Sequence, residues 1–383
     1  MTADPMGMNR LEHYVSTAPF DPYSVEQMSP EQERYFMASQ WRMMWWKLKR
    51  HRLAVLSAAI LGLMYFTTLI SEFLSPYALD SRHIHHIYAP PQSVHLFHEG
   101  SFVGPFVYGY DYELNMDTLQ RVYTVDPTDV QPIRFFCRGD VYDFWGLFPA
   151  DLHLMCPAEG GTLFLLGTDR LGRDMLSRLI HGGRLSLLMG ITPVINALVI
   201  GSLLGIVAGF VGGKVNMVIM RTVDVFYAFP SVLLAIAISG ALGAGLVNSI
   251  VSLTIVFIPP ITRVAESVTT SVRNLDFVEA ARASGAGSFT IIRVHVLGNV
   301  LGPVFVFATG LISVSIILAS GLSFLGLGVR PPEPEWGLML NTLRQSIYVN
   351  PWVCALPGVM IFITSICFNL MSDGLRAAMD VKS

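Results

Sequence analysis

Residues 276–287 have the sequence DFVEAARASGAG, a short polar stretch between two long apolar segments. Asp276 is expected to cap the N-terminus of a helix, supported by Glu279 three residues later. Gly285 and Gly287 are expected to end that helix in left-handed geometry. A helix of about two turns is marginal alone in water, because nucleation costs more than a few backbone hydrogen bonds return. We therefore expect this helix to be held by something that it packs against.

The composition indicates a protein that crosses a lipid bilayer several times. The chain has 383 residues, of which 52% are hydrophobic and 14% are charged, and its mean hydropathy is +0.52. Ordinary soluble domains carry about 25% charged residues, so the excess of apolar residues predicts a polytopic membrane protein. The net charge of -3 does not indicate a nucleic-acid partner.

A basic and aromatic cluster precedes the first apolar run, at residues 53–74. Bases next to a span favour the cytoplasmic side, and tryptophans favour the membrane interface. Residues 1–52 are therefore predicted to be a cytoplasmic tail and anchor, and residues 53–74 the first transmembrane helix. No removable signal peptide is expected. The cluster consists of Trp41, Arg42, Trp45, Trp46, Lys47, Lys49, Arg50 and Arg52.

Residues 75–184 contain no apolar run long enough to cross a bilayer, and they are predicted to be a periplasmic insert. They carry thirteen acids and eight bases, so their net charge is negative, which fits the outside of the membrane. Aromatic and β-branched runs punctuated by Gly and Pro predict short strands and a small β-containing subdomain. Four arginines near the end of the insert are expected to pair with Asp169 and Asp174 on an interfacial helix. They are Arg170, Arg173, Arg178 and Arg184.

The remaining apolar runs predict five further helices within residues 185–372, followed by a cytoplasmic tail at residues 373–383. Gly201, Gly205 and Gly209 form a stripe on the second span, where another helix can approach closely. Six spans that start in the cytoplasm return the C-terminus there and place residues 276–287 on the same side. Pro230 is expected to kink the third span. The five predicted spans are residues 185–211, 223–242, 247–261, 300–322 and 351–370.

No motif of an ATPase or of another enzyme is found. The Gly213-Lys214 pair lacks the earlier glycine and the following hydroxyl residue of a phosphate-binding loop, because Ala208 and Val215 stand in those places. The chain is therefore predicted to catalyse no reaction and to hold no cofactor of its own.

The histidines and cysteines of the insert leave two questions. His83, His85 and His86 could bind a metal ion, but a solvated polar loop is the preferred interpretation and no metal site is predicted. Cys137 and Cys156 could form a disulfide in an oxidising compartment or stay unpaired, because the sequence does not give their separation.

The predicted spans hold almost no ionisable residues beyond Glu72 and Asp224, so a proton-coupled carrier is disfavoured. This leaves a membrane protein with one cytoplasmic helix that is suited to receive force from a separate subunit. An ordinary interhelical loop is the alternative. The helix offers one aromatic and several small residues, with two charged residues to orient it. These are Phe277, Ala280, Ala281 and Ser284, with Glu279 and Arg282.

The sequence DFVEAARASGAGSFTIIRVHVLGNV closely resembles the EAA loop of bacterial ABC importer permeases, specifically of the second permease subunit of the oligopeptide/dipeptide family. Four further motifs are similar to that family in the same order: WWKLKRHRLAVLSAAILGL, LGTDRLGRDMLSRLIHGGRLSLLMG, GLSFLGLGVRPPEPEWGLML and FNLMSDGLRAAMD. The resemblance implies an inner-membrane protein with the type I ABC importer permease fold, which is all-α with six transmembrane helices. The β-containing insert would lie between the first two helices.

Glu279, Ala280, Ala281 and Gly285 match the EAA-x3-G core of the family. The resemblance implies that residues 276–287 form a coupling helix that sits in a cleft of an ATPase subunit. It also implies the partners: a homologous second permease, two ATP-binding subunits that hold ATP and magnesium, and a periplasmic solute-binding protein. The residues predicted to couple the chain to the ATPase are Asp276, Phe277, Glu279, Ala280, Ala281, Arg282, Ser284 and Gly285.

Three features depart from the family pattern. Gly298 stands where the family usually has proline, the C-terminal motif lacks its usual following proline, and residues 81–165 lie outside the common pattern. The cargo stays open between peptides and oligosaccharides such as α-galactosides. An exporter, a channel or a membrane-bound enzyme that acts alone is a further alternative.

Overall fold

The computed structural model describes residues 40–117 and 120–379. The predictions for the tail at residues 1–39 and for residues 380–383 lie outside the described residues. The chain divides into two compact units between Met43 and Met44. Most of the predicted basic anchor belongs to helix α2 (Gln40–Arg50).

Within the described residues, five helical segments are long and apolar enough to cross a membrane. They contain α3 (Arg52–Leu69), α5 (Met175–Val211), α8 (Leu246–Arg273), α11 (Leu297–Phe324) and α13 (Pro351–Met379). A sixth span is added if the bent pair α6 (Gly213–Tyr227) and α7 (Ser231–Leu242) counts as one. The predicted helical membrane core with a small sheet insert is confirmed.

The third span differs from its prediction. The sequence predicts one kinked helix over residues 223–242, but α6 ends at Tyr227 and α7 starts at Ser231, with a bend of 89° between them. Proline has no backbone N–H and forces the preceding residue away from helical geometry. Pro230 therefore separates two helices instead of kinking one.

The fourth span is longer than the predicted residues 247–261. Helix α8 continues through Pro259 and Pro260 to Arg273. In membrane helices the carbonyl groups that proline leaves free are satisfied by neighbouring groups, so proline does not have to end the helix. The extension brings Arg263 and Glu266 onto a span helix, whereas the predicted boundaries place them in a loop.

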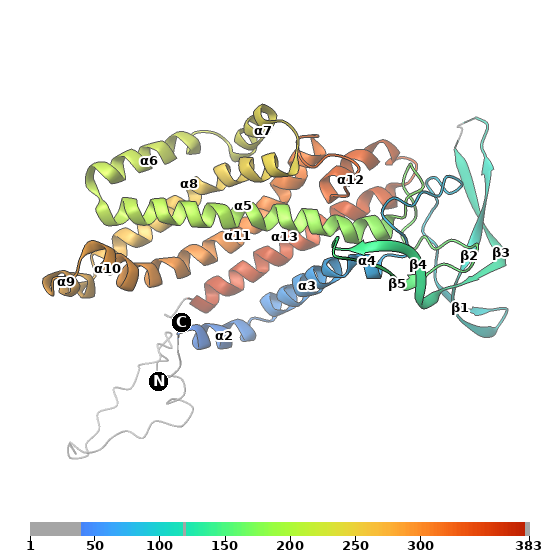
Figure 1. The fold of residues 1–383 in the computed structure, drawn as a ribbon, viewed down its shortest axis with the longest axis horizontal. Coiled ribbons are helices and arrows are strands. Elements are labelled where there is room, and N and C mark those ends of the chain that lie inside the picture. The colour runs from blue at the N-terminus through green and yellow to red at the C-terminus, as the bar shows by residue number, and fades with distance from the viewer. Residues whose placement is uncertain (1–39, 118–119, 380–383) are drawn as a thin grey trace, which may run out of the picture. The chain divides into compact units, whose positions relative to one another are not determined.

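The long helices α5, α8 and α11 lie side by side, and α13 packs on α11 (Figure 1). Helix α8 packs closely against α5 at the glycine stripe, which confirms the role predicted for it. A Cβ atom on Gly201, Gly205 or Gly209 would lie 2.9 Å or less from an atom of α8. Glycine lets the two backbones approach this closely because it has no side chain.

Helix α5 starts at Met175, so the predicted interfacial helix is the first part of a continuous helix and not a separate element. Asp174 caps it, and its carboxylate accepts a hydrogen bond from the Ser177 backbone N–H at 2.8 Å. Arg173 and Arg178 pair with Asp169, at N–O distances of 2.6 and 3.9 Å. The expected pairs with Asp169 are therefore found, while Asp174 serves as a helix cap.

The first membrane helix ends earlier than predicted, at Leu69, and a short helix α4 (Ser71–Leu74) follows. Arg184 of α5 explains the break, because its guanidinium donates to the carbonyl oxygens of Thr68 at 2.8 Å and Leu69 at 3.3 Å. The same guanidinium pairs with Glu72 at 2.5 Å. The prediction that Arg184 pairs with an aspartate of the insert is wrong.

The loop after α11 contains a helix that was not expected from the sequence, α12 (Trp336–Leu343), followed by the short 3-10 segment η2 (Arg344–Ser346). The buried Glu335 carboxylate caps α12 by accepting from the Gly337 and Leu338 backbone N–H groups at 2.9 and 2.8 Å. The Trp336 indole N–H donates to the Leu179 carbonyl oxygen at 3.0 Å. These contacts hold α12 against the first part of α5.

The insert forms two antiparallel sheets beyond α4 (Figure 1). The first sheet contains β1 (His95–His98), β2 (Ser101–Leu114) and β3 (Arg121–Pro132), in that order. The second contains β4 (Arg134–Phe144) and β5 (Phe148–Cys156), and both of its strands contact α4. The second sheet is therefore packed directly on the end of the first membrane helix.

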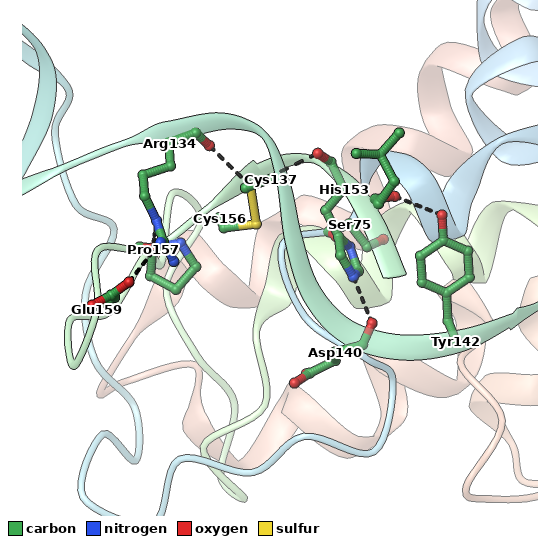
Figure 2. Close-up of a disulfide and its surroundings, with 10 residues drawn as sticks. Ser75, Arg134, Cys137, Asp140, Tyr142, His153, Cys156, Pro157 and Glu159 are labelled. Carbon is green, nitrogen blue, oxygen red and sulfur yellow. Dashed lines mark hydrogen bonds and ion pairs between the residues drawn. A yellow bond between two sulfur atoms is a disulfide. The ribbon is translucent and has the colours of Figure 1, made fainter. Parts of the chain in front are cut away.

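Figure 2 shows Cys137 and Cys156 joined by a disulfide between β4 and β5, with their Cα atoms 6.2 Å apart. The buried ring of His153 lies nearby, and its nitrogens are 2.6 Å from the Ser75 carbonyl oxygen and 2.8 Å from the Asp140 carbonyl oxygen. These contacts tie the second sheet to the chain that follows α4.

His83 lies in the predicted loop, but its ring is partly buried instead of fully solvated. Its ring packs edge-on against the rings of Tyr77 and Phe164, with centroids 4.6 and 5.1 Å away. Its Nε2 atom is buried and has no hydrogen-bond partner in the structure. Among the residues that the structure describes, no three His, Cys, Asp or Glu side chains are grouped so that they could hold a metal ion.

Candidate functional site

The polar stretch between α8 and α11 begins with helix α9 (Asp276–Ala283). Leu275 occupies the N-cap position and makes no side-chain cap bond, so the prediction that Asp276 caps this helix is wrong. Asp276 and Glu279 lie instead in its first turn, and Arg282 lies in its last. Each charge is then next to the helix end of opposite partial charge, which stabilises a short helix.

The end of α9 is closed by a Schellman motif. The backbone N–H of Ala286 donates to the Ala281 carbonyl at 3.0 Å, and that of Gly285 donates to the Arg282 carbonyl at 3.0 Å. Gly285 has φ +82°, the left-handed geometry that was predicted for it from the sequence. Gly287 has φ -67° and ψ 154°, so its predicted left-handed geometry is wrong.

One side of α9 is held by its own chain. Val278 is fully buried in the main core together with Val272 of α8 and Ile291, and Ala281 packs against the same core. Burying a valine side chain stabilises a protein by about 1.5–3 kcal/mol. The expectation that α9 needs a support is met within this chain, and Ala281 belongs to the supported side instead of the exposed face.

The opposite side of α9 faces solvent and carries most of the residues predicted to couple. Phe277 is 41% exposed, with its ring centroid 6.0 Å from that of His295. The guanidinium of Arg282 lies 5.7 Å from the ring centroid of Phe210, at the end of α5. This exposed side of α9 therefore presents an aromatic ring together with small and charged side chains. Its other exposed residues are Asp276, Glu279, Ala280 and Ser284.

A continuous helical segment leads from α9 back into the core. Helix α10 (Ser288–Ile291) is followed by the π-helical segment η1 (Ile292–Val296) and then by α11. Gly298 lies inside α11, and a Cβ atom at this position would meet nothing within 4 Å. The absence of proline at Gly298 is therefore compatible with an uninterrupted start of α11.

Polar contacts connect the last turns of α8 to the end of α5 and to the start of α6, before α9 begins. The guanidinium of Arg273 donates to the carbonyl oxygens of Gly209 and Phe210, at 3.3 and 3.0 Å. The amide of Asn216 donates to the Glu266 carboxylate at 2.6 Å. The Arg273 contacts use carbonyl groups that the end of α5 leaves free. Helices α5 and α8 are thus fastened together at the base of α9.

A second group of polar residues lies at the break between α6 and α7, and only half of it was expected from the sequence. Arg263 of α8 pairs with Asp224 of α6 at 2.5 Å, and its guanidinium lies 4.3 Å from the ring centroid of Tyr227. A pocket of about 210 Å³ adjoins it, lined by both sides of the break and by α8 and α11. The predicted end of the fourth span at Ile261 leaves Arg263 in a loop, because α8 continues to Arg273.

Two family models match the chain. Residues 201–382 match the model described as binding-protein-dependent transport system inner membrane component. Residues 39–91 match the model described as the N-terminal TM domain of oligopeptide transport permease C. The strands of the insert lie between the two matched regions. These matches define a class: membrane components of binding-protein-dependent transport.

Similar curated proteins narrow the class. The di/tripeptide transport system permease protein DppC of Pseudomonas aeruginosa is 48% identical over 58% of this chain and 74% of its own length. The glutathione transport system permease protein GsiD of Pectobacterium atrosepticum is 44% identical over 57% of this chain and 72% of its own. A solved structure of the inward-facing MetNI methionine ABC transporter aligns with 53% of this chain and 97% of its own, with TM-score 0.45 and 21% identity. The chain belongs to the oligopeptide/dipeptide family of ABC importer permeases, as a second permease subunit, and is a transport subunit and not an enzyme.

Proposed function

We propose that this chain is a permease subunit through which an ATP-driven importer moves peptides or peptide-like solutes, and that α9 transmits the motion of the ATPase subunits to the spans. The observation that carries the proposal is the two-sided character of α9. Val278 fixes one side to the core, while Phe277, Glu279 and Ala280 on the other side face solvent. A helix built in this way can receive a partner without losing its own support.

The contacts around α9 give a route for that motion. A push on α9 acts on α8 through the buried Val278 and on α5 through Arg273, which binds the end of that helix. Helix α8 carries Arg263, which pairs with Asp224 at the break between α6 and α7. A broken span next to a rigid helix pair is where a change of access can be absorbed.

The proposed assembly contains three kinds of partner. A homologous permease would lie beside this chain in the inner membrane, and two ATP-binding subunits would bind ATP and magnesium and dock on α9. A periplasmic solute-binding protein would deliver the cargo on the side of the insert. Both termini would then lie in the cytoplasm, the side that receives the basic cluster of α2.

Peptide cargo has the stronger support. The similar proteins DppC and GsiD are named for di/tripeptide and glutathione transport, respectively. Uptake of a labelled dipeptide by cells that lack the chromosomal gene and carry it on a plasmid tests this choice. Unlabelled peptides should compete with the label, and α-galactosides should not. Competition by α-galactosides alone would contradict a peptide importer.

The coupling role is tested by reversing one exposed charge. Glu279→Lys should abolish most uptake and reduce the amount of ATPase subunit that co-purifies with the chain, because the docking side of α9 changes sign there. Asp373→Lys is the control, since Asp373 is an exposed carboxylate on α13, away from α9. Equal uptake and equal co-purification for wild type and Glu279→Lys would overturn the coupling role of α9.

A further inference from the structure

The tip of the β4–β5 hairpin exposes large apolar side chains that nothing in the described part of the chain covers. Leu147 is 78% exposed at the turn, and its neighbours Trp145 and Phe148 are each about half exposed. Contiguous exposed apolar groups of this kind mark a contact surface for another molecule or for a membrane. Farther along β4, the Phe136 ring lies near Phe73 of α4, with centroids 6.3 Å apart, so the hairpin lies beside α4.

The tip is bonded to the end of the first membrane helix. The Trp145 indole N–H donates to the Leu69 carbonyl oxygen at 2.8 Å, and its backbone N–H donates to the Glu72 carboxylate at 3.3 Å. The Arg184 guanidinium lies 3.9 Å from the Trp145 ring centroid and pairs with Glu72. The height of the hairpin tip along α3 is therefore fixed by direct contacts.

That height coincides with the edge of the hydrocarbon region. Helix α3 has 18 residues, which at about 1.5 Å of rise per residue is about 27 Å, close to the roughly 30 Å hydrocarbon thickness of a bilayer. If Arg52 marks one edge, Leu69 marks the other. Leu63, Phe66 and Leu69 are more than half exposed on α3, as expected for a lipid-facing surface. The hairpin tip continues this surface at the level where tryptophan is enriched.

We infer that the β4–β5 tip is a membrane anchor of the insert: Leu147 and Phe148 enter the outer edge of the bilayer and contact lipid acyl chains. Trp145 sits at the interface and joins them to α3. The lipid contact would fix the second sheet against the membrane surface and thereby set the orientation of the insert. The inference requires only that α3 spans a bilayer, so it does not depend on the cargo or on coupling through α9.

The experiment measures the depth of a fluorophore in vesicles. The full chain, with Cys354 and Cys367 replaced by serine and the disulfide kept, carries an environment-sensitive fluorophore on Leu147→Cys. It is reconstituted into vesicles of phosphatidylethanolamine and phosphatidylglycerol that contain lipids with a nitroxide on the acyl chain. Met116→Cys, in the turn of the other hairpin, is the matched control, because Met116 is 79% exposed.

The expected result is blue-shifted emission and several-fold stronger nitroxide quenching at position 147 than at position 116. Phe148→Cys serves as a second labelled position and should behave like position 147. Equal weak quenching at positions 147 and 116 would overturn the anchor. Blue-shifted emission without quenching by the lipid nitroxide would also overturn it, because a protein surface would then cover the tip.

Discussion

At the scale of single residues, Gly285 decides how α9 ends. Its φ of +82° costs a residue with a side chain about 1–2 kcal/mol. Gly285→Ala should therefore open the Schellman motif more often and speed hydrogen exchange at the Ala286 N–H by about five- to thirtyfold. Uptake should fall with it, because the docking side loses its fixed orientation.

Gly287→Ala is the matched control for Gly285→Ala. Gly287 has an extended conformation with a negative φ, and a Cβ atom there would meet nothing within 4 Å. Exchange at Ala286 and uptake should stay close to wild type. If both variants behaved alike, the end of α9 would not depend on left-handed geometry.

The partial burial of His83 predicts that the stability of the insert depends on pH. Burial lowers the pKa of His83, and only Asp140 opposes the shift, so the folded chain favours the neutral ring. An unfolded histidine has a pKa of about 6.5. The contribution of His83 to the stability of the insert should be complete above about pH 6.5 and should be lost as the pH falls toward the lower folded pKa. The readout is the rate of proteolysis of the insert at about pH 7.5 and about pH 5.5.

His83→Phe should weaken this acid sensitivity, because phenylalanine fills the place beside Tyr77 and Phe164 and binds no proton. His85→Phe is the control, since His85 is exposed.

Burial raises the pKa of Asp174 to about 6, and this group makes the chain less stable as the pH rises from about 4 to about 6. Comparing variants at the same pH removes its contribution. Identical acid sensitivity in wild type and His83→Phe would refute the role of His83.

At the scale of elements, the contact between α5 and α8 depends on the absence of side chains. A Cβ atom on Gly205 would lie 2.5 Å from the Ala265 Cβ and 2.6 Å from the Thr262 carbonyl oxygen. Gly205→Val should therefore force the helices apart and cost at least about 1–3 kcal/mol. The expected result is a lower unfolding temperature of the purified chain and, through the shifted base of α9, slower uptake.

Gly62→Val tests whether any added valine in a membrane helix has this effect. Gly62 lies on the exposed side of α3, and a Cβ atom at this position would meet nothing within 4 Å. The unfolding temperature of Gly62→Val should match that of wild type. An equal loss of stability in both variants would mean that the glycine stripe is not a special contact.

The elements also show what could be predicted from the sequence. The apolar runs predict the membrane helices because their signal is local, and the motif at residues 276–287 points to α9. The ends of the elements depend on tertiary contacts. Arg184 binds carbonyl groups at the end of α3. Helix α8 continues past Pro260, and the residues after this proline pack against α5. The partner of Arg184 is 112 residues away in the sequence, so no local pattern indicates it.

At the scale of the whole molecule, the two sheets of the insert have different attachments. The second sheet is fastened to the end of α3 and α4 by Trp145 and His153. The first sheet is instead held to other loops of the insert, for example by the hydroxyl of Tyr123, which donates to the Ile87 carbonyl oxygen. The sheet that is farther from the membrane anchor is therefore the better candidate to meet a soluble partner.

Removing the first sheet tests that division. His95 of β1 and Pro132 of β3 both pair with Phe106 of β2, so they lie about 10 Å apart, which is two strand spacings. A linker of about four glycine and serine residues can replace residues 95–132, since about 13 Å is within its reach. The variant should still co-purify with the ATPase subunits and hydrolyse ATP at its basal rate, but lose stimulation by the solute-binding protein. Glu279→Lys should show the reverse, weak ATPase association with the insert intact. Full stimulation after the deletion would show that the first sheet does not meet the solute-binding protein.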